Sequence, residues 1–275
     1  MAALRIVFDV AWFRLRRLEM ANLVAAGALL ISLHAPWADL LVRGLAGALL
    51  NLLVYLNNDY HDVAEDLEAA SKDQEKNRFL ADNMISALIA QIVLVALLFG
   101  IAAWWDMGLV VPIVAGGGIC WAYSAYLKRR PVVDVVAMVI WGGTMPAVAF
   151  SPDLTLGWIL VGQLALTSGS FESVQVLRDH DEDAEAGVRT TAVLIGKERT
   201  WSMMRVFIVL TAVYCSLLIH RYAGLIPLLA LALPRSEPAR YWNGLRGVMG
   251  LAFLASCAQV FFFKETFGWV GRWGL

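Results

Sequence analysis

The chain alternates long apolar stretches with shorter polar segments, and the apolar stretches set the expected fold. Nine of them occur along its 275 residues, at 18–35, 38–57, 84–104, 107–127, 131–150, 156–177, 201–219, 222–234 and 244–263. Most are about 20 residues long, the length that a helix needs to cross a bilayer. The pattern predicts an all-α polytopic membrane protein, with about nine transmembrane helices in a single bundle around a central cavity.

The composition agrees with a membrane location. Hydrophobic residues make up 60% of the chain and charged residues 16%, which excludes an ordinary soluble domain. Because no long flexible linker interrupts the pattern, residues 1–275 are expected to form one domain. The lipid bilayer is an expected partner, and no nucleic acid is. Cys120, Cys215 and Cys257 lie inside apolar stretches without metal-ligand spacing, so we expect them to be small buried side chains.

The placement of basic residues predicts the orientation. Residues 1–17 combine apolar side chains such as Phe8 and Trp12 with four arginines, the pattern of an amphipathic helix in the membrane interface. With nine spans, one side of the membrane holds 18 of the 22 Lys and Arg residues and the other side holds four. Cytoplasmic loops carry the excess of basic residues. The N-terminus is therefore expected on the cytoplasmic side.

Two acidic clusters carry the strongest chemical signal, and the same count places both on the cytoplasmic side. The first runs from Asn58 to Asp66 and the second from Asp179 to Asp183, each directly after an apolar stretch. Residues 59–83 and 178–199 together hold 14 of the chain's 23 Asp and Glu residues. Carboxylates at this density repel one another unless they share a cation, so we expect a divalent metal ion.

The spacing inside each cluster suits a shared ion. Asn58, Asp62 and Asp66 recur every four residues, which puts them on one face if the helix continues past the membrane edge. Asp179 and Asp183 repeat that spacing 121 residues further on, counted from Asp62 to Asp183, which suggests two four-helix halves with a ninth helix appended. Mg²⁺ usually binds one or two carboxylates together with phosphate oxygens of a substrate. Two such helices facing each other therefore predict a diphosphate bridged by Mg²⁺.

Cationic side chains accompany the clusters. Arg78 lies just after the first cluster, and Lys128 and Arg129 begin a basic run at the end of the fourth apolar stretch. Metal ions together with Lys or Arg stabilise the negative charge that develops on a departing phosphate group. If that group leaves an allylic carbon, the rest of the substrate is apolar. It then needs an apolar cavity, which a membrane helix bundle supplies.

These motifs resemble those of the UbiA superfamily of intramembrane prenyltransferases. The first cluster fits the pattern N-D-x-x-D-x-x-x-D from Asn58 to Asp66, and the second fits D-x-x-x-D followed by a Gly and Thr stretch that ends at Gly196. Residues 76–80 look like the family's K-x-R-P-L segment, with Phe79 in place of the usual proline. The resemblance spans nearly the whole chain.

The resemblance implies Mg²⁺-dependent transfer of a prenyl group from an isoprenyl diphosphate to a lipophilic acceptor, through ionisation to an allylic carbocation. Asp62 and Asp183 are then expected to be essential for catalysis. Arg78 and Lys128 are expected to contact the diphosphate, and Arg129 is included in this set. The implied metal ligands share oxygen donors: Asn58, Asp59, Asp62, Asp66, Asp179 and Asp183.

Two further acids lie near the clusters. Glu172 lies seven residues before Asp179, inside a predicted span, where an acid is costly unless it faces a partner or a polar cavity. It is a candidate catalytic residue that positions or deprotonates the acceptor, and the alternative is a hydrogen bond between helices. Asp134 follows the basic run and is expected to form a salt bridge with it, and the alternative is an outer carboxylate that supports the metal site.

Other functions use parts of the same pattern. Some UbiA-like proteins are terpene cyclases, which share the ionisation step and need no acceptor. A divalent-cation transporter would also need acids, but here they gather at the ends of the spans. A CDP-alcohol phosphotransferase is excluded because its D-G-x-x-A-R signature is absent. The identity of the acceptor and the length of the donor chain are left open.

Overall fold

The computed structural model describes residues 1–16, 20–68, 74–235 and 237–263, and every regular element within these ranges is helical. The prediction of an all-α protein is confirmed. The α-helices are α1 (Ala2–Arg16), α2 (Ala21–Ser32), α3 (Trp37–Glu68), α4 (Gln74–Asp82), α5 (Met84–Trp104), α6 (Gly118–Ala122), α7 (Val133–Thr144), α8 (Thr155–Arg178), α9 (His180–Glu185), α10 (Thr191–Ile195), α11 (Lys197–Leu218), α12 (Leu225–Leu228) and α13 (Pro238–Phe263). The 3-10 and π-helical segments are η1 (Met107–Leu109), η2 (Pro112–Gly117), η3 (Tyr123–Leu127), η4 (Pro146–Ala149) and η5 (Leu229–Ala232).

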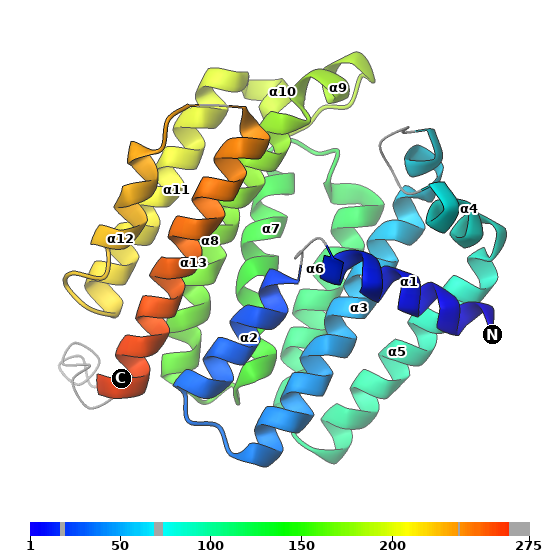
Figure 1. The fold of residues 1–275 in the computed structure, drawn as a ribbon, viewed down its shortest axis with the longest axis horizontal. Helices are drawn as coiled ribbons and strands as arrows, with labels where there is room; N and C mark the ends of the chain where they lie inside the picture. Colours follow the sequence, from blue (N-terminus) through cyan, green and yellow to red (C-terminus); the bar gives the residue numbers. More distant parts are fainter. Residues whose placement is uncertain (17–19, 69–73, 236, 264–275) are drawn as a thin grey trace.

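The long helices lie side by side as one bundle (Figure 1). Within the described ranges, five segments are long and apolar enough to cross a membrane, namely α3, α5, Met107–Leu127, α11 and α13. Two shorter apolar segments are α2 and Val133–Ala149. A helix or helical segment lies in each of the nine predicted stretches, but α8 and the short pair α12–η5 are not among these seven apolar segments. The count of nine spans is therefore not confirmed.

Helix α8 buries several polar side chains, which explains why it is not apolar enough to be counted among these segments. It packs against α7, α11 and α13, and its buried side chains include Gln163, Thr167 and Glu172. Small residues allow its neighbours to approach closely. A Cβ atom added to Gly142 of α7 would lie 2.3 Å from the Ser168 side chain of α8. Helix α8, which leads into the second acidic cluster, is thus packed against other helices on several sides.

The fourth apolar stretch forms an irregular helix. Two π-helical segments, η2 and η3, flank the single turn and a half of α6. Wider turns of this kind re-aim the side chains that follow them and are frequent at functional sites. Here η3 ends one residue before Lys128, which follows as its C-cap.

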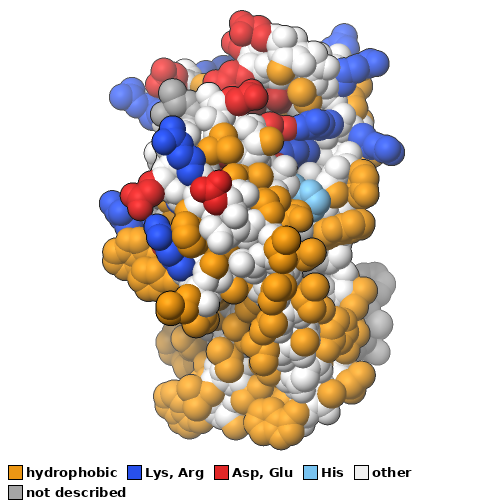
Figure 2. All heavy atoms as spheres, turned by 90° about the vertical axis from the view of Figure 1, so that its right-hand side faces the viewer, with side chains coloured by type: hydrophobic (Ala, Val, Ile, Leu, Met, Phe, Trp, Pro, Cys, Tyr) orange, Lys and Arg blue, Asp and Glu red, His pale blue; other side chains and the backbone are white. Residues whose placement is uncertain are grey.

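The two acidic clusters lie at the same end of the bundle. Figure 1 shows the last turns of α3, with α4, at the upper end of the molecule, where α9 and α10 also lie. Figure 2 shows one side of the molecule, with Asp, Glu, Lys and Arg side chains gathered toward this end and hydrophobic side chains covering the other. The side of the membrane on which this end lies stays a prediction.

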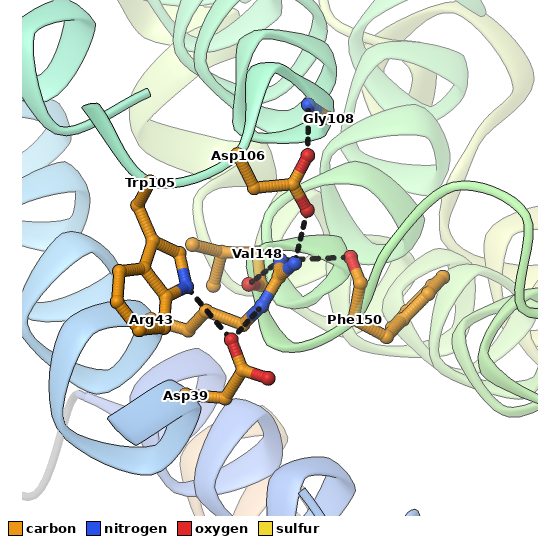
Figure 3. A network of polar contacts seen from close by, with 7 residues as sticks. All are labelled: Asp39, Arg43, Trp105, Asp106, Gly108, Val148 and Phe150. Atoms are coloured by element: carbon orange, nitrogen blue, oxygen red, sulfur yellow. Dashed lines mark hydrogen bonds and ion pairs between the residues drawn. The ribbon is translucent and has the colours of Figure 1, made fainter. Parts of the chain in front are cut away.

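The opposite end of the bundle is closed by a network around Arg43 of α3 (Figure 3). The Arg43 guanidinium, 5% exposed, donates to Asp39 at 3.1 Å and to the carbonyl oxygens of Val148 and Phe150 at 3.3 and 3.1 Å. It also pairs with Asp106, which precedes η1. One side chain therefore ties α3, the turn after α5 and η4 together.

Candidate functional site

The first acidic cluster lies on α3, which continues as one helix through Glu68. Asn58, Asp62 and Asp66 therefore share a face, as their spacing predicts. All three side chains are partly exposed. The cluster is thus presented on a continuous helix, not on a loose loop.

Lys128 and Arg129 approach this cluster from the neighbouring helix. The Lys128 ammonium pairs with Asp62 and lies 3.6 Å from a Glu65 oxygen, and Arg129 pairs with the same Glu65. Two of the three predicted diphosphate-binding cations are therefore paired with acids of the first cluster. Among the residues that the structure describes, Arg78 of α4 is exposed and has no ion-pair partner.

The helix 107–127 bridges the two motif-bearing helices. Ser124 donates to the Asn58 side-chain oxygen on α3 at 3.4 Å, and one residue earlier the Tyr123 hydroxyl donates to Glu172 on α8 at 2.9 Å. Glu172 is buried. Neither Tyr123 nor Ser124 was among the predicted site residues. The sequence offered one signal for them: Tyr123 lies five residues and Ser124 four residues before Lys128, on the same predicted helix.

The second cluster begins where α8 ends. The Asp183 amide donates to the Asp179 carbonyl at 2.9 Å, so the two acids keep the predicted helical spacing across the junction of α8 and α9. Arg178 binds both Asp179 oxygens, at 2.7 and 3.1 Å. Gly187 then turns the chain with a φ of 72°, a conformation that glycine adopts without strain.

Asp183 is crowded by negative charge. Burial raises the pKa of its carboxyl group, and the nearby Asp179, Glu182 and Asp134 carboxylates raise it further. A carboxyl group in such surroundings favours a bound cation over the free anion. Asp181, by contrast, is exposed and binds Lys197 at 2.6 Å, which lowers its pKa.

Asp134 does not form the salt bridge that its position suggested. This fully buried carboxylate at the start of α7 accepts from the Thr191 backbone amide and the Val135 amide, each at 2.8 Å, and from the Thr191 hydroxyl. The Val132 amide in turn donates to the Thr191 hydroxyl at 2.6 Å. The expectation was wrong because neutral donors satisfy the buried acid, and the two from Thr191 fasten the segment after the second cluster to α7.

The donor chemistry of the clusters fits Mg²⁺. Among the described residues, no three Asp, Glu, His or Cys side chains already converge as a closed metal site. The available donors are carboxylate and amide oxygens, which suit a hard cation that retains waters and takes substrate phosphate oxygens as ligands. A pocket of about 180 Å³ opens beside the first cluster, lined by His61, Ser124, Ala125, Tyr126, Lys128 and Arg129.

Solved structures share this fold. A UbiA homologue from Archaeoglobus fulgidus bound to DMAPP and Mg²⁺ is 16% identical with a TM-score of 0.68, covering 96% of this chain and 100% of that one. The same homologue bound to GPP and Mg²⁺ is 18% identical with a TM-score of 0.66, covering 95% and 99%. A structure of a digeranylgeranylglyceryl phosphate synthase is 14% identical with a TM-score of 0.73, covering 95% and 99%. A comparison with curated proteins found no match.

The UbiA prenyltransferase family matches residues 21–262, which is most of the chain. That match agrees with the two acid-rich motifs at one end of an apolar helix bundle. The chain is therefore an integral membrane protein that belongs to the UbiA prenyltransferase family.

Proposed function

We propose that the protein is a Mg²⁺-dependent prenyltransferase that moves a prenyl group from an isoprenyl diphosphate to a lipophilic acceptor. The observation that carries the proposal is the placement of both acid-rich motifs at one end of the bundle, with Lys128 paired to Asp62 of the first motif and the apolar helices below. Family membership and the DMAPP- and GPP-bound relatives support the same donor class.

The side chains would divide the work between metal and diphosphate. Bound Mg²⁺ would neutralise the diphosphate and make it a better leaving group. From α3, Asn58, Asp62 and Asp66 would supply ligands on one face. From the α8–α9 junction, Asp179 and Asp183 would supply the opposing ligands.

Cations would hold the departing diphosphate. Lys128 already pairs with Asp62 of the first motif, so its ammonium would exchange Asp62 for a phosphate oxygen. Arg129 and the exposed Arg78 would add charge at the rim. Stabilising the charge that builds on the leaving oxygen lowers the barrier to breaking its bond with the allylic carbon.

The hydrocarbon tail would lie among the apolar helices, shielded from water. Exclusion of water protects an allylic carbocation from hydrolysis until the acceptor reaches it. A central chamber of the predicted kind is part of this proposal, as is the cytoplasmic position of the motif-bearing end. The acceptor is expected to be lipophilic because it must share that chamber.

Diphosphate release tests the proposal. Purified protein in lipid nanodiscs would be supplied with Mg²⁺, then with DMAPP, geranyl, farnesyl or geranylgeranyl diphosphate, with and without total membrane lipid as acceptor source. We expect Mg²⁺- and acceptor-dependent diphosphate release, with EDTA abolishing it, and a prenylated lipid detected by mass spectrometry.

Other outcomes separate the alternatives. Diphosphate release without acceptor, together with a cyclic hydrocarbon, would identify a terpene cyclase. Metal flux into proteoliposomes without diphosphate release from any donor would identify a cation transporter. In both cases the prenyltransferase proposal would be rejected.

A further inference from the structure

Asp59 differs from the other acids of the first motif in where it lies. It is 2% exposed, whereas Asn58, Asp62 and Asp66 are partly exposed. One residue along an α-helix turns the side chain by about 100°, so Asp59 projects away from the face that the other three share. Its surroundings are therefore different from those of the neighbouring ligands.

Each oxygen of Asp59 is bound by a cation from a different helix. Arg14 of α1 donates to Oδ1 at 2.5 Å, and Lys76 of α4 donates to Oδ2 at 2.7 Å. The side chains of Arg14 and Lys76 are themselves mostly buried, at 15% and 9% exposed. The Asp59 carboxylate thus joins α3 to both α1 and α4.

Aromatic rings support the same two cations. The Arg14 guanidinium lies 4.7 Å from the centre of the Tyr55 ring on α3, and the Lys76 ammonium lies 4.8 Å from that of Phe13 on α1. Cations over aromatic faces are attracted to them, more strongly where water is excluded. Aromatic rings therefore help to hold Arg14 and Lys76 in place around Asp59.

A second contact between α1 and α4 involves the unusual Phe79. The Arg5 guanidinium of α1 lies 3.9 Å from the centre of the Phe79 ring, and it pairs with Glu75 at 3.3 Å. Phe79 stands where the resembling family segment has proline. In this chain that position gives α1 a surface to dock on.

We propose that Asp59 is a positioning residue that fastens α1 and α4 to the first motif, and that it is not a metal ligand. The proposal rests on the proposed function, because it concerns the metal site assigned there. A metal ion on Asp59 would have to displace two mostly buried cations and would then lie beside them, which like-charge repulsion disfavours. Anchoring α4 instead fixes Arg78, two residues after Lys76, relative to Asp62.

Thermal unfolding of the metal-free protein tests the anchor. We expect Arg14→Gln to lower Tm by about 5 °C, because a partner of a buried carboxylate is lost. In the Asp59→Asn background the same Arg14→Gln change should lower Tm by much less than in the wild type, since the ion pair with Asp59 is already lost. Arg14→Lys should restore most of the loss. Arg16→Gln, an exposed arginine on the same helix, should leave Tm unchanged.

Mn²⁺ binding separates an anchor from a ligand. With inorganic diphosphate present, electron paramagnetic resonance would count bound Mn²⁺. Asp62→Asn should lose bound ions or weaken their affinity more than tenfold. Asp59→Asn and Arg14→Gln should each bind the wild-type number of Mn²⁺ ions. Both changes should weaken the affinity for Mn²⁺ by the same factor, below about threefold.

Three results would overturn the proposal, and none of them depends on prenyl transfer. One is loss of Mn²⁺ in Asp59→Asn equal to that in Asp62→Asn, with Arg14→Gln unaffected. Another is a wild-type Tm for Arg14→Gln. The third is an equal fall in Tm on adding Arg14→Gln to wild type and to Asp59→Asn. If Asp59→Asn does not fold, the comparison of Arg14→Gln with Arg16→Gln still decides the Tm question.

Discussion

Near the start of α3, Arg43 gathers two carboxylates and two backbone carbonyls around one guanidinium (Figure 3), whereas near the end of the same helix Lys128 and Arg129 pair with Asp62 and Glu65 at a more exposed site. Arg43 is almost completely buried, whereas Lys128 keeps 20% exposure and its partner Glu65 is exposed. The first arrangement is saturated by protein groups. The second keeps oxygen atoms accessible for another cation.

The difference shows how to separate structural from functional charge in a membrane bundle. Both ends contain Arg or Lys paired with Asp, so the residue types alone do not distinguish them. What distinguishes them is how deeply the cation is buried, and so how easily another cation can reach the acid: Arg43 is 5% exposed, whereas Lys128 is 20% exposed. By this criterion we expect Asp39 and Asp106 to be structural and Asp62 and Asp183 to be functional, and the proposal above makes Asp59 a structural acid inside the first motif.

Removing an acid from the accessible end should give the largest effect, and it should fall on activity. We expect Asp62→Asn and Asp183→Asn each to lower the rate of diphosphate release by about 10²–10³-fold, because a metal ligand is lost where charge develops. Tm should change little. Steady-state rates and thermal unfolding measured on the same preparations check both parts. Asp181→Asn is the matched control, since this acid of the same cluster is exposed and paired with Lys197.

Disrupting the Arg43 network at the other end should have the opposite effect, lowering Tm and leaving activity nearly unchanged. Arg43→Gln leaves two carboxylates without their buried partner, which we expect to cost about 3 kcal/mol, the low end for a buried pair because Asp39 and Asp106 keep 28% and 26% exposure. Tm should fall by roughly 6–12 °C. Diphosphate release per folded molecule should stay within about threefold at low temperature.

Arg221→Gln provides the control for that end, because the Arg221 guanidinium contacts only the Tyr222 ring among the described interactions. We expect it to leave both Tm and rate unchanged. A large loss of activity in Arg43→Gln at unchanged Tm would contradict the division between the two ends.

The sequence predicted the features that depend on local periodicity. The stretch 84–104 coincides with α5, and the four-residue spacing of Asn58, Asp62 and Asp66 places them on one face of α3. Such features follow from the 3.6-residue turn of a helix. The irregular helix at 107–127 was predicted as a span, without its π-helical turns.

Contacts between distant residues could not be predicted in this way. Asp134 and Thr191 are 57 residues apart, and Arg14 and Asp59 are 45 apart. Periodicity shows which residues share a face, but it does not show which other helix that face meets. For that reason the sequence could not show that Asp59 meets Arg14 and Lys76, and it wrongly gave Asp134 the basic run as a partner.

The Asp134–Thr191 contact offers an intermediate case between the two ends. It is buried and satisfied, as at the closed end, but it fastens the segment after the second cluster. Thr191→Val removes a hydroxyl that donates to Asp134 and accepts from Val132, so we expect a cost of about 1–2 kcal/mol. Displacement of the second cluster should also lower kcat/KM about tenfold.

Thr191→Ser keeps the hydroxyl and should stay near wild type in both measurements. Unchanged kcat/KM in Thr191→Val, with the expected fall in stability, would show that this contact supports the fold without positioning the cluster.

The Glu172–Tyr123 hydrogen bond should show the smallest effect. Its acid lies deep in the bundle, where it either serves the acceptor or only links α8 to the bridging helix. Because the Tyr123 hydroxyl already satisfies Glu172, we expect Glu172→Gln, which retains an acceptor oxygen, to stay within about threefold of the wild-type rate. Tyr123→Phe should cost about 1–2 kcal/mol, since it leaves a buried acid unpaired. A fall of 10²-fold in Glu172→Gln at unchanged Tm would instead assign this acid to proton removal from the acceptor, and accessible oxygen would no longer be the mark of a functional acid in this bundle.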